Sequence, residues 1–165
     1  MAELQRILER LIRHEVECVL VGGYAAMVHG VSLVTKTIDV CTHFSRQNLE
    51  RIHAAVAELH PYHFLTPQEL PFVIPPGFER GLRNLYIGTD IGRLDCLEEI
   101  PGIGDYTAAR AESIPLQLPF GCVWMLSRKA MIRAKSALDR PHDKITVMQL
   151  LVIEERQQKQ PELDL

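Results

Sequence analysis

The sequence predicts an α/β protein with a small, mixed and twisted β-sheet and helices packed mainly on one face of that sheet. The main observation is an alternation along the chain. Short runs of apolar and β-branched residues, typical of buried strands, alternate with segments whose apolar residues recur every three or four positions, as in amphipathic helices. The length of 165 residues fits one domain with its own core. A content of 47% hydrophobic and 24% charged residues is ordinary for a globular chain.

In the first part of the chain, turn and cap residues separate the expected elements. Gly22 and Gly23 interrupt the apolar run that begins at Cys18, Gly30 is a natural helix stop, and Ser45 is a favourable N-cap. The expected elements are a helix over 3–15, a strand over 18–21, a helix over 24–29, a strand over 37–42 and a helix over 46–59.

Five prolines within 60–81 predict a long irregular loop after the third helix. The expected elements beyond it are a hairpin of strands 84–87 and 93–97, a short helix over 105–111, a hairpin of strands 114–118 and 122–125, and helices over 128–138 and 141–157. Residues 1–157 are therefore expected to form a single domain, and 158–165 a frayed tail.

Charge and hydropathy exclude several classes of protein. The net charge of −3 gives no general attraction for nucleic acid, so any such contact requires a local basic patch. No apolar run approaches the roughly 20 residues that cross a bilayer, and the N-terminal segment has no signal-peptide pattern. We expect no membrane partner and a cytoplasmic location; the oligomeric state is not predicted.

Three features in order indicate a site for a polyphosphate and a divalent cation. Gly22 and Gly23 stand at a strand-to-helix turn, where a backbone without Cβ atoms can approach phosphate groups closely. Asp39 and Asp95 stand on two later strands. Carboxylates on adjacent strands can share a hard cation that neutralises phosphate charge.

The segment 21–30, VGGYAAMVHG, followed by 33–40, LVTKTIDV, resembles the signature of the nucleotidyltransferase superfamily. That signature is a strand, a Gly-Gly or Gly-Ser pair, a short helix often ending in His-Gly, and Thr-x-Asp-x-Asp on the next strand. The segments 92–97, GRLDCL, and 135–143, KSALDRPHD, resemble the third-acid strand and a downstream Lys–Arg–Asp element of its minimal members, which include nucleotidyltransferase toxins.

The resemblance implies the nucleotidyltransferase fold and a set of site residues. Asp39 and Asp95 would be catalytic and would bind Mg²⁺ or Mn²⁺. Gly22, Gly23, Thr35, Thr37 and Lys135 would contact a nucleoside triphosphate, with Thr35 alternatively satisfying the backbone near the turn. The implied reaction transfers a nucleoside monophosphate to a hydroxyl on RNA, protein or a small molecule.

Thr37 departs from the family pattern, because it replaces the first acid of Asp-x-Asp. Three interpretations remain open. Asp39 and Asp95 hold one metal with Thr37 as a weak ligand, or Asp90 or Glu98 supplies the missing acid, or the pocket persists without the chemistry. In the last case the chain is a non-catalytic nucleotide-binding or protein-interaction module, such as a partner in a toxin–antitoxin pair.

Overall fold

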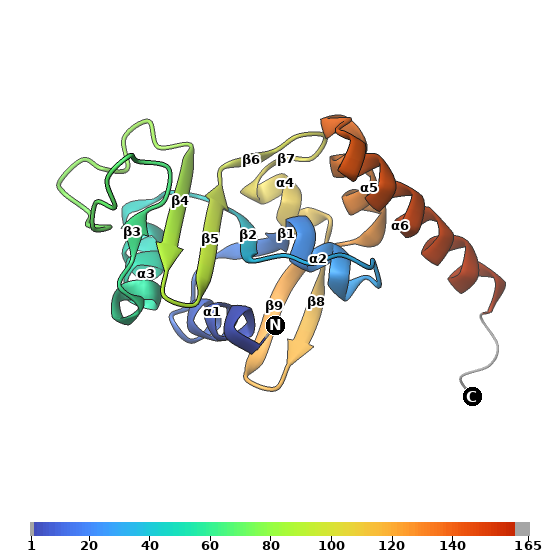
Figure 1. Cartoon of the computed structure of the whole chain (residues 1–165), viewed down its shortest axis with the longest axis horizontal. Helices are drawn as coiled ribbons and strands as arrows, with labels where there is room; N and C mark the ends of the chain where they lie inside the picture. The colour runs from blue at the N-terminus through green and yellow to red at the C-terminus, as the bar shows by residue number, and fades with distance from the viewer. Residues whose placement is uncertain (1, 161–165) are drawn as a thin grey trace.

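A seven-stranded mixed sheet forms the centre of the computed structural model, which describes residues 2–160 (Figure 1). The strand order is β3-β4-β5-β2-β1-β9-β8. The strands of this sheet are β1 (Cys18–Val21), β2 (Thr37–Thr42), β3 (Tyr62–His63), β4 (Asn84–Thr89), β5 (Gly92–Leu97), β8 (Ser113–Leu118) and β9 (Gly121–Leu126). A separate two-stranded ribbon pairs β6 (Glu99–Ile100) with β7 (Gly104–Asp105).

The helices are α1 (Ala2–Arg13), α2 (Gly22–Val28), α3 (Arg46–Val56), α4 (Tyr106–Ala111), α5 (Arg128–Leu138) and α6 (Pro141–Lys159), with a 3-10 turn at Ala57–Leu59. The expected α/β class is confirmed, and the predicted helices and strands occur in the predicted order. None of the helices in the described part of the chain is long and apolar enough to cross a membrane.

The three central strands combine both pairing directions. β2 runs antiparallel to β1 and parallel to β5, while β1 runs parallel to β9. The predicted hairpins β4–β5 and β8–β9 extend the sheet on either side. Because β2 lies between β1 and β5, the end of β1 and the acids of β2 and β5 meet at one place.

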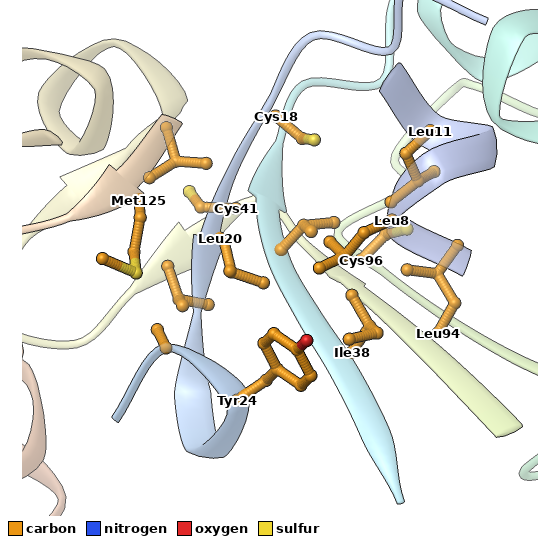
Figure 2. Close-up of a cluster of buried hydrophobic side chains, with 14 of the residues drawn as sticks. Leu8, Leu11, Cys18, Leu20, Tyr24, Ile38, Cys41, Leu94, Cys96 and Met125 are labelled. Carbon is orange, nitrogen blue, oxygen red and sulfur yellow. The ribbon is translucent and has the colours of Figure 1, made fainter. Parts of the chain in front are cut away.

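The expectation that helices pack mainly on one face is wrong. α1 and α3 lie on one side of the sheet, and α4 and α5 lie on the other. Figure 2 shows Leu8 and Leu11 of α1 on one side of β1 and β2, and Cys41 and Met125 on the opposite side. The physical reason is that all four residues of β1 are buried, and a strand buried on both faces needs cover on both.

Most element boundaries differ from the expectations by one to three residues, and three differences concern the site, the proline-rich segment and the tail. α2 begins at Gly22 rather than at residue 24, so the glycine pair forms its first turn. The proline-rich segment 60–81 contains β3 and buries Phe72, so it is tied to the sheet rather than wholly irregular. α6 continues to Lys159, two residues beyond the expected end, and 161–165 of the expected tail lie outside the described residues.

Candidate functional site

A cavity of about 490 Å³ opens where β1, β2 and β5 meet α5. All seven residues expected to form the site line it: Gly22, Gly23, Thr35, Thr37, Asp39, Asp95 and Lys135. Two further cationic side chains, Arg93 and Arg140, also line it. The wall therefore carries three cationic groups and two carboxylates, a balance suited to an anionic ligand accompanied by a cation.

Asp39 and Asp95 are direct cross-strand partners on β2 and β5. Burial and the neighbouring Asp95 charge raise the pKa of Asp39 to about 6, although Lys135, Arg93 and the backbone N–H of Gly23 act in the opposite direction. Burial also raises the pKa of Asp95, which is only 4% exposed, against the opposing effect of Arg93. Two carboxylates held this close to each other and away from water favour a bound cation.

The glycine turn is built around Asp39. Gly22 has φ +69, a left-handed conformation, and a Cβ at this position would lie 2.5 Å from Asp39 Oδ2. The backbone N–H of Gly23 acts to lower the pKa of the Asp39 carboxyl, against the larger effect of burial. Gly23 also lines the cavity, where its predicted contact with a phosphate group stays a prediction.

Arg93 is the site residue that sequence reasoning missed. Its Nη2 lies 2.6 Å from Asp95 Oδ2, and its guanidinium carbon lies 4.6 Å from the centroid of the Phe64 ring. A signal was present in the sequence, because residues two apart on a strand share a face and Arg93 stands two before Asp95.

Lys135 and Arg140 are positioned by one buried acid, Asp143, which is fully excluded from solvent. Asp143 Oδ1 lies 3.4 Å from Lys135 Nζ, and Oδ2 accepts a 2.5 Å hydrogen bond from Arg140 Nε. Burial alone would raise the pKa of Asp143, but the hydrogen bond and charge of Arg140 and Lys135 outweigh it and lower that pKa. The downstream Lys–Arg–Asp element therefore orients two cations at the cavity wall.

Replacing Asp143 by asparagine is expected to lower the free energy of unfolding by about 1–2 kcal/mol, because Lys135 and Arg140 would lose the charge they face. Urea unfolding at neutral pH measures this. Asp139→Asn is the matched control. Asp139 is exposed and, among residues 2–160, pairs only with exposed Lys144, so loss of its charge is expected to cost less than about 0.5 kcal/mol. Equal effects of the two substitutions would contradict the positioning role of Asp143.

The two threonines of the cavity wall have different surroundings. Thr35 Oγ1 accepts from the backbone N–H of Thr37 and donates to its carbonyl oxygen, so Thr35 satisfies the backbone near the turn. Thr37 is the cross-strand partner of Arg93.

Neither acid considered as a replacement for the missing one reaches the cavity. Asp90 Oδ2 lies 2.5 Å from His60 Nδ1, and Glu98 Oε2 lies 3.2 Å from Arg83 Nε. Both residues are absent from the cavity wall. Of the three open interpretations, the one in which Asp90 or Glu98 supplies the acid is therefore not supported, because both side chains form ion pairs outside the cavity.

The side chains present suit one divalent cation better than two. Within residues 2–160 there is no cluster of three His, Cys, Asp or Glu side chains that could hold a metal. Asp95 Oδ1 is nevertheless buried without a hydrogen-bond partner among the described residues, so this oxygen can coordinate a cation. Mg²⁺ commonly takes one or two carboxylates and completes its shell with phosphate oxygens and water, which Asp39 and Asp95 can support.

No protein-family model matches the sequence, and no curated protein gives a significant match.

Proposed function

We propose that this chain is a nucleotidyltransferase-like protein that binds a nucleoside triphosphate together with one Mg²⁺ or Mn²⁺ ion. The observation that carries the proposal is the paired Asp39 and Asp95, beside the Gly22–Gly23 turn and facing three cationic side chains in one cavity. In this assignment Asp39 and Asp95 hold the cation, which neutralises phosphate charge. Lys135 and Arg140 contact the phosphates.

The cavity also offers an apolar region for the rest of a nucleotide. Its remaining lining includes one tyrosine and a group of apolar side chains: Tyr86, Val21, Leu97, Ile100, Pro101, Leu126, Met131, Ala134 and Leu138. An apolar wall next to a few convergent charged groups is the usual form of a small-molecule site. We assign the phosphates to the charged region and the nucleoside to this apolar wall.

Transfer of a nucleoside monophosphate to a hydroxyl acceptor is the activity that belongs to such a site, and we propose that it is weak or lost here. Thr37 is a neutral ligand where an acid is needed, and Arg93 faces it across the strands. The second candidate function, a non-catalytic nucleotide-binding module, is favoured by this pair of residues. Both candidates require the triphosphate to bind.

Calorimetric titration with each of the four common nucleoside triphosphates tests the proposal. We expect at least one of them to bind with Mg²⁺ or Mn²⁺ and to lose affinity when a chelator is added. No binding of any triphosphate at millimolar concentration, by protein whose circular dichroism shows it to be folded, would exclude the proposed function.

Lys135→Met is expected to weaken triphosphate binding about tenfold, because it removes a cation from the cavity wall. Lys129→Met is the matched control on the same helix: Lys129 is exposed and lies outside the cavity, so we expect unchanged affinity. Calorimetry on both variants measures the difference. Similar affinities for the two variants would show that Lys135 does not contact the ligand.

A further inference from the structure

We propose that Arg93 is a built-in phosphate-binding cation that takes the place of a second metal ion, so that the cavity accepts a polyphosphate carrying a single divalent cation. This inference deepens the proposed function. It rests on that function only for the identity of the ligand, that is, for assigning the polyphosphate to a nucleotide.

The sheet register places Arg93 at the position where a second cation would need ligands. Thr37 pairs with Arg93, and Asp39 pairs with Asp95. Since side chains alternate along a strand, these two neighbouring pairs lie on one face, and all four residues line the cavity. One pair offers two carboxylates, while the other offers a hydroxyl group and a permanent positive charge.

Two contacts hold the Arg93 side chain in place. Asp95 accepts its hydrogen bond at 2.6 Å, and the Phe64 ring lies 4.6 Å from its guanidinium carbon. Phe64 belongs to the proline-rich segment after β3, so this segment helps to hold the Arg93 side chain in place. The side chain is still about one-third exposed, which leaves the guanidinium accessible from the cavity.

Unpartnered atoms beside Arg93 show that its polar surroundings are incomplete. Arg93 Nε and Asp95 Oδ1 are both buried without hydrogen-bond partners in residues 2–160. A buried polar atom without a partner costs free energy, and native structures retain such atoms mainly where a ligand, an ion or water completes them. Arg93 Nε is a donor suited to an anion, and Asp95 Oδ1 is an acceptor suited to a cation.

Charge explains why one metal ion is expected rather than two. Arg93 already occupies Asp95 Oδ2, and a dication on the same oxygen would face its positive charge at close range. One cation can use Asp39 and the other oxygen of Asp95. The guanidinium can then bind a phosphate group through its remaining N–H groups, as planar guanidinium groups do in many phosphate sites.

The test uses inorganic tripolyphosphate and Mn²⁺, so that it depends on no particular base. Calorimetry gives the affinity, and electron paramagnetic resonance of Mn²⁺ gives the number of ions bound per chain. We expect the native chain to bind Mn²⁺–tripolyphosphate with one Mn²⁺. Arg93→Gln is expected to weaken tripolyphosphate binding at least tenfold, and Arg93→Lys, which keeps the charge, less. Arg83→Gln, outside the cavity, serves as the control and should bind normally.

A double variant provides a gain of function as a second readout. Thr37→Asp combined with Arg93→Gln restores an acid and removes the competing charge, so we expect two Mn²⁺ ions per chain with tripolyphosphate. Any of three results would overturn the inference. These are two Mn²⁺ ions bound per native chain, an unchanged affinity of folded Arg93→Gln for tripolyphosphate, or no binding of tripolyphosphate by the native chain. Arg93-dependent binding of tripolyphosphate without binding of any nucleoside triphosphate would support the inference while excluding the proposed function.

Discussion

Gly22→Ala is expected to lower the free energy of unfolding by about 3 kcal/mol or more and to abolish ligand binding. The left-handed backbone at φ +69 costs an alanine roughly 1–2 kcal/mol. The new Cβ would also lie 2.5 Å from Asp39 Oδ2, so the carboxylate must move away. Urea unfolding and calorimetric titration with Mn²⁺–triphosphate measure the two effects.

Gly23→Ala is the matched control for stability. Atoms nearest to a Cβ at this position lie 3.5 Å away, which is ordinary contact, and Gly23 does not have a positive φ. Alanine is moreover a better helix former than glycine, so we expect unchanged or slightly higher stability. If Gly22→Ala and Gly23→Ala have the same free energy of unfolding, the close packing of Gly22 on Asp39 is contradicted.

Asp39→Asn is expected to weaken metal-dependent triphosphate binding a hundredfold or more while making the folded chain more stable at neutral pH. Binding is lost because the cation loses a charged oxygen ligand that an amide replaces poorly. Stability rises because the negative charges of Asp39 and Asp95 no longer lie side by side away from water. Function at this site therefore has a cost in stability.

The direction of the pH dependence follows from the raised pKa. Asp39 titrates at about 6 when folded, against an ordinary value of 3.8, so the folded state holds its proton more tightly. Stability due to Asp39 is thus highest below about pH 4 and is lost as the pH rises through 6. The difference in the free energy of unfolding between Asp39→Asn and the native chain should therefore grow from near zero at pH 4 to about 2–3 kcal/mol at pH 7.

Unfolding in urea at a series of pH values, with Asp90→Asn as the control, measures this gain. Asp90 is exposed, and its one ion pair in the described part of the chain is with exposed His60. Its variant should therefore retain ligand binding and should not share the gain in stability near neutral pH. If Asp39→Asn is less stable than the native chain at pH 7, the account of the paired carboxylates is contradicted.

The sequence predicted those parts of the fold that depend on local pattern. The apolar spacing in 3–15 and the cap residue Ser45 are local signals, and the corresponding helices form, with Ser45 capping. The placing of helices on both faces depends on which strands lie in the middle of the sheet. That is a long-range property, and the uninterrupted apolar run of β1 is the one local signal from which it could have been inferred.

The candidate site was predictable where strand order brings the motif residues together. Asp39 and Asp95 are 56 positions apart but become direct partners because β2 and β5 are neighbours. Arg93 was missed because a charged residue on a strand usually faces solvent, and nothing local says that Phe64 will cover it. Asp90 and Glu98 were near in sequence yet bind His60 and Arg83 instead.

A crystal structure with Mn²⁺ and a non-hydrolysable nucleoside triphosphate tests the central claim most directly, because the anomalous scattering of manganese locates the ion without ambiguity. We predict one Mn²⁺ peak in contact with the carboxylates of Asp39 and Asp95, with phosphate groups between that ion and the side chains of Arg93 and Lys135. A triphosphate bound outside this cavity, or a cavity that contains neither ligand at saturating concentrations, would contradict the claim.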